Sequence, residues 1–470
     1  MTVIDTQTIE RVVNEVIQRL GTDAAVAQSR PGNGSGLFND VDQAVDAAAG
    51  SQRQLADAGL TVRDEICSTL KQMAADNAQA WGQFEFEETK IGRLDHKIVK
   101  LELLKNIPGV EFLRAQAHSG DEGVSLDEAA PWGVIGVITP VTHSIPTMTS
   151  NAINMIAAGN AMVVNPHPGG AKSAALAASA YNRAIGQRFG IDPLICVIDP
   201  PTLRSAEEIF RHQRIGLLAV TGGPAVARAA MKQPKRAIVA GPGNPPVVVD
   251  ETADLDNAAR SIIEGGGFDN NLLCIGEKQV FVVASVFDGM RQALTSAGAA
   301  ELDSSAVSRL TDAAFEYKDD HHVVQKSLLG KDPQELGQAA GVTVKPNVDL
   351  LFGETAENHP FVSQEQMMPF IPLVRVAGFD DALRLALESE HGFGHTAVIH
   401  SNNLDRITRM GRAMNTTIFV ANGPSTAALG VRGEGYTSYS IATPTGEGVT
   451  TPLTFTRFRR LGISGALRII

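Results

Sequence analysis

One cysteine lies in a polar, glycine-rich stretch, and these surroundings indicate a catalytic role for it. Cys274 lies in GGGFDNNLLCIGEK, residues 265–278, after glycine, acidic and amide residues. A thiolate nucleophile needs exposure and stabilisation by amide donors or a helix N-terminus, whereas a structural thiol needs neither. Cys274 is therefore a candidate catalytic nucleophile. A hydrolytic Cys/His pair stays open, although no histidine lies in a recognisable protease context.

The other two cysteines have the surroundings of structural residues. Cys67 lies in VRDEICSTLKQMAADNAQAWGQFEFEE, which has helical spacing, and Cys196 lies in the short apolar run LICVIDP. Both are expected in the core. Three cysteines, far apart, indicate a reducing compartment without a disulfide framework.

Two glycine-containing turns could bring a phosphate close to the backbone. In LLAVTGGPAVARAA, Thr221 and Pro224 suit the start of a helix, and Gly222 with Gly223 let a ligand approach. NPHPGGAKS, residues 165–173, is a second strand-to-helix turn. A helix N-terminus after such a turn can bind a phosphate. The signal is weak alone, because G-x-G-x-x-G follows none of these strands.

The elements that must position these residues alternate along the chain. Residues 37–98 have helical spacing throughout, and from Pro131 short apolar runs alternate with helical stretches, as in WGVIGVITP, AMVVNPHPGGAKSAALAASAYNRAIG and IGLLAVTGGPAVARAAMK. Apolar runs of four to eight residues between helices indicate a parallel sheet covered on both faces. The predicted fold class is α/β.

Bulk composition excludes several classes of protein. The chain has 470 residues, 43% of them hydrophobic and 5% aromatic, and a formal net charge of −12. Its length suits two or three folding units. The negative charge argues against a nucleic-acid partner, and no apolar run approaches the ~20 residues of a membrane helix.

The first 36 residues differ from the rest of the chain. Residues 1–20 have the spacing of an amphipathic helix, with an apolar stripe at Ile9, Val12, Val13, Val16, Ile17 and Leu20. Residues 21–36, GTDAAVAQSRPGNGSG, indicate a flexible linker. Two interpretations remain open for the helix: it packs on its own domain, or it docks on a partner. Neither a secretory signal nor a mitochondrial presequence fits it.

A series of motifs gives the chain a family resemblance. WGVIGVITP, AAGNAMVVNPHPGGAKS, AVTGGP, AGPGNPPVVVD, FDNNLLCIGEK, FVSQEQMMPFIPLVRV, HGFGHTAVIHS and YSIATPTGEG occur in the order expected for the aldehyde dehydrogenase superfamily. Over residues 37–470 the chain most closely resembles the CoA-acylating propionaldehyde and acetaldehyde dehydrogenases of bacterial microcompartments.

That resemblance implies an organisation and a location. It implies a Rossmann-type NAD- and CoA-binding domain at 37–249, a catalytic domain at 250–428, and a return segment with an oligomerisation strand at 429–470. It also implies a dimer or tetramer, an encapsulation role for residues 1–20 toward a shell protein, and a cytoplasmic location within a microcompartment. No metal is expected.

The resemblance also assigns roles to residues. Cys274 matches the nucleophile that attacks a short-chain aldehyde such as acetaldehyde, propionaldehyde or lactaldehyde. The resulting thiohemiacetal passes a hydride to NAD, and the thioester that remains is transferred to coenzyme A. Glu365 matches the glutamate that holds a cofactor ribose. The implied cofactor residues are Thr139, Pro140, Asn165, His167, Gly222, Gly223, Gly241 and Glu365.

Two departures from the hydrolytic relatives bear on the reaction. Where those enzymes carry a water-activating glutamate, the segment AGPGNPP places Ala240. Where they carry an asparagine that stabilises the oxyanion, TPVTHSIP has Thr142 and His143, so either is expected to pair with the Cys274 amide. His143 could instead pack, or recognise a hydroxyl on the substrate.

Other interpretations stay open beside the acylating one. A hydrolytic aldehyde dehydrogenase that makes the free acid is disfavoured by Ala240. A non-catalytic microcompartment cargo or scaffold protein is disfavoured by the intact Cys274 motif. His359, in ENHPF, could deprotonate CoA, although a structural role is the simpler expectation.

Overall fold

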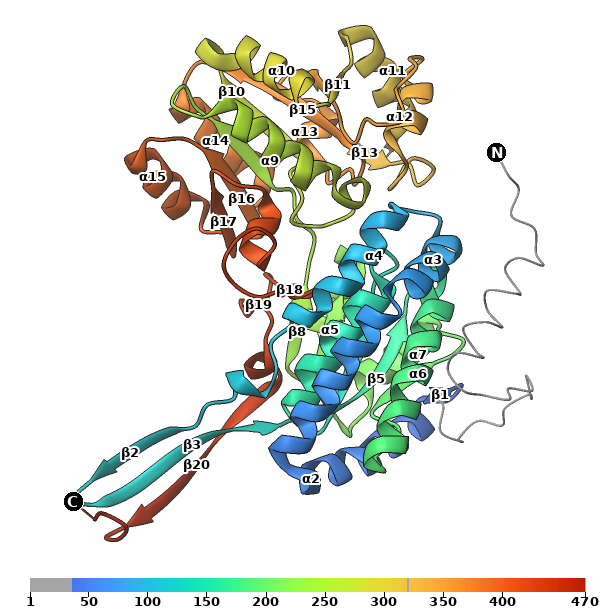
Figure 1. Ribbon diagram of the computed structural model, residues 1–470, viewed down its shortest axis with the longest axis vertical. Helices are drawn as coiled ribbons and strands as arrows, with labels where there is room; N and C mark the ends of the chain where they lie inside the picture. Colours follow the sequence, from blue (N-terminus) through green and yellow to red (C-terminus); the bar gives the residue numbers. More distant parts are fainter. Residues whose placement is uncertain (1–35, 319–320, 470) are drawn as a thin grey trace.

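Two parallel sheets, each with its own helices, make up the main body of the molecule (Figure 1). The computed structural model describes residues 36–318 and 321–469. The expected helix at residues 1–20 and all but the last residue of the expected linker therefore lie outside the described residues. None of the helices within the described ranges is long and apolar enough to cross a membrane.

The first sheet has six parallel strands in the order β1-β6-β5-β4-β7-β8. Every residue of β4 and β5 is buried, which is why their sequences are almost continuously apolar. The strand order reverses at β4, as in doubly wound folds. The strands are β1 (Leu37–Phe38), β4 (Val134–Thr139), β5 (Ala161–Pro166), β6 (Ile195–Ile198), β7 (Ile215–Thr221) and β8 (Ala237–Ala240).

Within the described part of the chain, seven α-helices accompany this sheet. The first, α2, begins after Asp40, whose carboxylate accepts a hydrogen bond from the Gln43 amide at 2.8 Å. The helix is interrupted at Gly59, where φ is +80°. Cys67 in α2 and Cys196 in β6 are buried, as predicted. The helices are α2 (Val41–Asp76), α3 (Ala78–Thr89), α4 (Leu94–Glu102), α5 (Ser144–Ala157), α6 (Ala171–Phe189), α7 (Leu203–Arg211) and α8 (Pro224–Met231).

The second sheet has seven parallel strands in the order β11-β14-β15-β10-β9-β16-β17. They are β9 (Pro246–Val249), β10 (Gln279–Val283), β11 (Ala300–Glu301), β14 (Leu351–Glu354), β15 (Phe370–Val376), β16 (Thr396–His400) and β17 (Ile418–Ala421), with a hairpin of β12 (Phe315–Lys318) and β13 (His321–Val324). Its helices are α9 (Leu255–Gly267), α10 (Phe287–Ser296), α11 (Ser304–Ala314), α12 (Pro333–Ala339), α13 (Pro360–Ser363), α14 (Phe379–Glu390) and α15 (Leu404–Met414).

Short 3₁₀ turns connect these elements. They are η1 (Leu103–Asn106), η2 (Val110–Phe112), η3 (Pro168–Gly170), η4 (Phe268–Asn271), η5 (Ala284–Val286), η6 (Ser425–Leu429) and η7 (Pro452–Phe455).

The boundary between the two sheets differs from the sequence prediction. β9 was expected to close the first unit at residue 249, but it pairs with β10 and β16 in the centre of the second sheet. The sequence could not separate the cases, because a fully apolar strand fits the middle of either sheet. Residues 241–245 therefore connect the carboxyl edge of the first sheet directly to the amino edge of the second.

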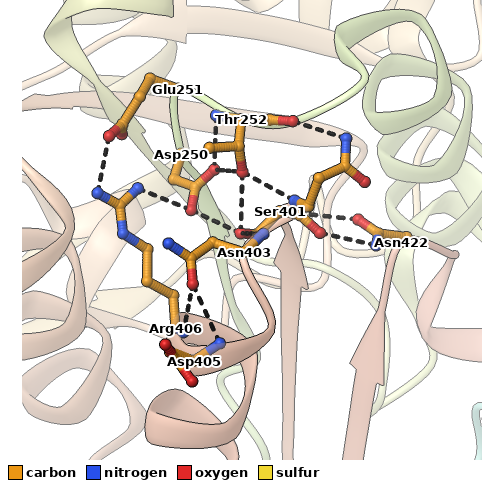
Figure 2. A network of polar contacts seen from close by, with 9 residues as sticks. Asp250, Glu251, Thr252, Ser401, Asn403, Asp405, Arg406 and Asn422 are labelled. Atoms are coloured by element: carbon orange, nitrogen blue, oxygen red, sulfur yellow. Dashed lines mark hydrogen bonds and ion pairs between the residues drawn. The ribbon is translucent and has the colours of Figure 1, made fainter.

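A buried carboxylate fixes the opposite, carboxyl edge of the second sheet (Figure 2). Asp250, directly after β9, accepts hydrogen bonds from Ser401 Oγ at 2.6 Å and Arg406 Nη1 at 3.0 Å, and from Thr252. Since Ser401 follows β16, these contacts tie the ends of two neighbouring strands together. The network lies at the edge opposite the amino end of β10, where the segment that contains Cys274 leads into that strand.

A three-stranded antiparallel arm extends from the body (Figure 1). It contains β2 (Gln116–Gly120), β3 (Gly123–Pro131) and β20 (Thr456–Ser464). β20, the expected oligomerisation strand, pairs along its whole length with β3 of the same chain. Before it, the return segment passes the first sheet at β18 (Ile441–Ala442) and β19 (Gly448–Val449), and Ser440 Oγ lies 2.9 Å from Thr221 Oγ1.

Candidate active site

The reversal of strand order places two predicted cofactor residues at one sheet edge. Thr139 ends β4, Gly222 directly follows β7, and these two strands are neighbours. Ligands of open α/β sheets bind outside the carboxyl ends of the strands at such a reversal. Thr139 Oγ1 is buried there and has no hydrogen-bond partner among the described residues. This edge therefore has a free polar group where a ligand is expected.

The two predicted phosphate turns differ in what already occupies them. At the start of α6, the carboxylate of Glu88 accepts hydrogen bonds from the amides of Lys172 and Ser173 at 2.9 and 2.8 Å. An internal anion thus fills that helix N-terminus. At the start of α8, the N-cap residue Gly223 has no side chain with which to cap the helix, and a Cβ there would meet no described atom within 4 Å. The α8 turn can therefore take a phosphate, while the α6 turn is filled.

The remaining predicted cofactor residues are spread along this edge. Asn165 is held internally, because its side chain accepts from Ser205 Oγ at 2.5 Å and donates to the Thr202 carbonyl at 3.4 Å. His167 is exposed, and its Nδ1 accepts from the Gly169 amide at 3.0 Å. A Cβ on Gly241 would lie 2.8 Å from the Pro444 ring. Pro140 and Gly222 follow β4 and β7 directly.

Cys274 follows a turn of left-handed backbone. Asp269, Asn270 and Asn271 have φ of +51°, +55° and +62°. Asp and Asn are the non-glycine residues that adopt this conformation most readily, which explains the sequence DNN at this point. Each side chain is anchored: Asp269 to the Arg93 amide at 2.9 Å, Asn270 to the Gly330 carbonyl at 3.0 Å, and Asn271 to the Glu277 carbonyl at 2.9 Å.

Two buried charged residues hold the other side of the cysteine loop. Lys278 Nζ donates to the carbonyls of Asn271 and Leu273 at 2.8 and 3.2 Å and to the side chain of Asn271. Burial lowers the pKa of Lys278 to about 8. Glu277 accepts from the amide and hydroxyl of Ser425, both at 2.8 Å, and burial raises its pKa to about 7. The loop is thus fixed on both sides of the thiol.

The thiol of Cys274 opens into a largely apolar pocket. The cavity has a volume of about 80 Å³. Its lining residues are Leu103, His143, Glu264, Phe268, Leu273, Cys274, Ile275, Thr426, Leu429, Val431, Thr437, Ser438, Tyr439 and Ile441. The carboxylate of Glu264 is paired with Arg432 at 2.8 Å. Such a space suits a small molecule with an apolar chain.

Burial keeps the resting thiol protonated. It raises the pKa of Cys274 to about 12; the neighbouring Glu365 acts in the same direction, and Lys278 and the amides of Cys274 and Ile275 oppose it. The sequence pattern had indicated a thiolate stabilised by amide donors. These donors are present, but burial outweighs them. A nearby base must therefore take the proton before the sulfur can react.

Two titratable side chains meet beside the cysteine at Gly243. The Gly243 amide lies 3.4 Å from Glu365 Oε1, and a Cβ on this glycine would lie 2.7 Å from the Cys274 carbonyl and 2.8 Å from the His395 ring. His395 Nε2 is buried without a partner among the described residues, and burial lowers the pKa of this imidazole to about 4. Glu365, predicted to bind the cofactor, thus lies between the cofactor edge and the thiol.

Of the other polar residues that were expected near Cys274, the structure places only some at its pocket. His143, at the start of α5, lines the pocket of Cys274, whereas Thr142 is not among the described residues that line it. His359 lies elsewhere: it caps α13, and its Nε2 is 3.3 Å from Thr311 Oγ1. No role was predicted from the sequence for His395, Lys278 or Lys100. His395 lies in HGFGHTAVIHS, but one of three histidines in a mainly apolar stretch gives no signal of its own.

Comparison with known proteins gives matches along nearly the whole chain. The model of the aldehyde dehydrogenase family matches residues 35–438. An acetylating acetaldehyde dehydrogenase of Salmonella typhimurium is 40% identical over 99% of both chains. A propionaldehyde dehydrogenase of Rhodopseudomonas palustris, solved with bound CoA and an acylated cysteine, superposes with a TM-score of 0.90 at 38% identity, covering 93% of this chain and all of that one.

A further solved structure adds a cellular context. It is a propionaldehyde dehydrogenase from the fucose utilisation bacterial microcompartment of Clostridium phytofermentans, with a TM-score of 0.89 at 39% identity. The match covers 93% of this chain and 100% of that chain.

Proposed function

Because this chain belongs to the aldehyde dehydrogenase family, we propose that Cys274 is the nucleophile of its reaction. The enzyme is a CoA-acylating aldehyde dehydrogenase: it oxidises a short-chain aldehyde with a nicotinamide dinucleotide and transfers the acyl group to coenzyme A. The observation that carries the residue assignment is the position of Cys274, which opens into the apolar pocket between the two sheets.

The first sheet has the features that a dinucleotide needs. The free N-terminus of α8 suits a diphosphate, and Thr139 Oγ1, without a partner among the described residues, lies at the neighbouring strand end. Glu365 would hold the ribose next to the thiol. When bound there, NAD supplies the acceptor for the hydride. Thr139, Gly222, Gly223 and Glu365 would bind and orient it.

Oxidation requires attack by sulfur and stabilisation of the aldehyde oxygen. The Cys274 sulfur forms a bond to the carbonyl carbon, and negative charge develops on the oxygen. We assign the stabilising donors to the Cys274 amide and the ring of His143, which lines the same pocket. Loss of the hydride from that carbon then gives a thioester on Cys274.

Removal of the thiol proton is assigned to His395. Its imidazole is neutral at pH 7 because burial lowers its pKa, and both its ring and the Cys274 carbonyl lie close to Gly243. A neutral imidazole can accept the proton of the Cys274 thiol, release it to solvent, and then accept the proton of CoA. CoA sulfur then attacks the thioester carbon, the bond to Cys274 breaks, and the leaving Cys274 thiolate takes the proton back from His395.

The glutamate that activates water in hydrolytic relatives has no counterpart at Ala240. Ala240 ends β8, and its methyl group cannot activate water. This substitution favours transfer to CoA over release of the free acid.

The function is tested by following NADH from propionaldehyde and NAD with and without CoA, together with mass detection of the product. We expect acyl-CoA to form when CoA is present. Turnover without CoA to the free acid would show that another residue activates water, and the acylating mechanism would be rejected.

The microcompartment relative and the sequence of the first 20 residues support a proposal for the cellular setting. We propose that the enzyme works inside a bacterial microcompartment, in the cytoplasm, and that the apolar stripe of residues 1–20 docks on a shell protein. An amphipathic helix on a linker needs a surface on which to bury its apolar face.

Deletion of residues 1–20 is expected to leave kcat for propionaldehyde unchanged within about twofold and to abolish co-purification with shell proteins. A full-length variant with Ile9, Val13 and Ile17 changed to serine should behave like the deletion, since it removes the apolar stripe. Retention of either variant in isolated compartments would contradict the docking role.

The proposed homo-oligomer uses the arm. Phe458 and Leu461 on β20 are 68% and 53% exposed. Apolar side chains of this size on a protruding antiparallel sheet suit contact with a second copy of the chain.

A further inference from the structure

A buried lysine beneath the pocket has more partners than a structural ion pair requires. Lys100, on α4, is fully buried, and its Nζ lies 2.5 Å from Asp269 Oδ2, 3.1 Å from His143 Nδ1 and 3.4 Å from the Thr142 carbonyl. An ammonium group has three N–H donors and no acceptor. The three neighbours can each accept one hydrogen bond, so the charged form of Lys100 is fully partnered. Burial lowers the pKa of this lysine, and the carboxylate of Asp269 opposes that shift by favouring the ammonium form.

This arrangement determines which nitrogen of His143 carries the proton. A neutral imidazole has one N–H and one acceptor nitrogen. If Nδ1 carried the proton, it would face an N–H of the Lys100 ammonium group at 3.1 Å, and two donors would oppose each other. With Nδ1 as the acceptor, the proton lies on Nε2. Since Nδ1 is turned toward Lys100, the Nε2 edge is left for the pocket that His143 shares with Cys274.

The surrounding charges keep His143 neutral. Burial, then Lys100, Lys97 and Lys278, lower its pKa well below the ordinary value, opposed by a hydrogen bond with the Thr142 backbone. Asp269 faces Lys100, and the Tyr439 ring lies 6.2 Å from the His143 ring. A protonated imidazole would add a cation beside a buried ammonium group. His143 is therefore suited to donate one hydrogen bond and unsuited to exchange protons.

We infer that Lys100 is a positioning residue for catalysis, which holds His143 in the Nε2–H form so that this nitrogen donates to the aldehyde oxygen at Cys274. The inference rests on the proposed function, which supplies the aldehyde. Asp269, whose own backbone begins the left-handed turn before Cys274, keeps the ammonium group in place. The same ion pair thereby links the oxygen-binding ring to the loop that carries the thiol.

The chain offers a matched control one turn earlier on the same helix. Lys97 is also buried, at 1% exposure, and is paired with Glu85 at 3.2 Å. Its ammonium group donates to the Glu85 carboxylate, whereas that of Lys100 reaches the His143 ring. Removal of Lys97 therefore takes away a buried ammonium group whose hydrogen bond goes to Glu85 and not to the ring of His143.

Solid-state ¹⁵N NMR of protein labelled at histidine can show directly which ring nitrogen of His143 carries the proton. The sequence has 11 histidines, so the signals of His143 are assigned by difference from His143→Asn. We expect the Nε2–H form in the wild type without substrate, and the same form in Lys97→Met. In Lys100→Met/Asp269→Asn, which removes both charges together, we expect a mixture of forms and a kcat at least about tenfold lower, with KM for CoA unchanged.

An Nδ1–H signal for His143 in the wild type would overturn the inference, even if the double variant does not fold. A folded double variant with wild-type kcat, or a Lys97→Met variant with an altered His143 signal, would also overturn it. The spectra need no turnover. A wild-type enzyme that shows the Nε2–H form but makes no acyl-CoA would therefore count against the proposed function and not against the role of Lys100 in fixing the ring.

Discussion

Cys274→Ala is expected to lower the rate of acyl-CoA formation by on the order of 10⁴-fold or more, since the thioester cannot form without the sulfur. The protein should remain folded, because the side chain lines a pocket and leaves no new cavity in the core. Mass spectrometry of the wild type, incubated with propionaldehyde and NAD without CoA, should show one acyl group on the peptide that contains Cys274.

Cys196→Ala is the matched control for this variant. Cys196 is fully buried in β6, away from the pocket, so its loss should cost some stability and leave kcat unchanged. If Cys274→Ala kept measurable thioester chemistry, or if the acyl group were found on Cys67 or Cys196, the assignment of the nucleophile would be wrong.

His143→Leu is expected to reduce kcat by about 10²–10³-fold, which is the usual consequence of losing one donor to a developing oxyanion. His143→Asn should recover most of the rate, because an amide can also donate from this position. The measurement is kcat at saturating NAD and CoA with propionaldehyde and, separately, with lactaldehyde.

The pair of aldehydes distinguishes two roles of the same ring. A donor to the aldehyde oxygen affects both substrates equally. A partner for a hydroxyl on the substrate would affect lactaldehyde alone, and such a selective loss would contradict the assignment of His143 to the oxyanion.

The architecture could be predicted from the sequence better than the details of the site. Alternating apolar runs and helices identified the parallel sheets, because buried parallel strands are apolar throughout. The same property made the boundary between the two sheets unpredictable. β9 is as apolar as β4, and the sequence around β9 does not show which strands pair with it. The glycine-rich approach identified the loop of Cys274, since Asp and Asn at positive φ leave a recognisable sequence pattern.

Contacts between residues far apart in the chain could not be predicted from the sequence. Lys100 looks like any lysine on an amphipathic helix, and 169 residues separate it from Asp269. Glu88 reaches the N-terminus of α6 across 84 residues, so two phosphate turns looked equivalent in the sequence although one of them is already filled. The raised pKa of the Cys274 thiol also depends on burial, which its polar sequence neighbours concealed.

The left-handed turn before the thiol has a consequence for the motions of the molecule. Its three side chains are hydrogen-bonded to three separate regions: α4 at Lys100, the backbone at Gly330, and the entrance to β10 at Glu277. Local unfolding of this loop therefore breaks contacts with a helix of the first sheet and with the second sheet at the same time. For a loop anchored in this way, we expect a free energy of local unfolding similar to that of a core segment. We expect its amide hydrogens to exchange slowly, and we expect the Cys274 sulfur to be carried by a stiff connection between the two sheets.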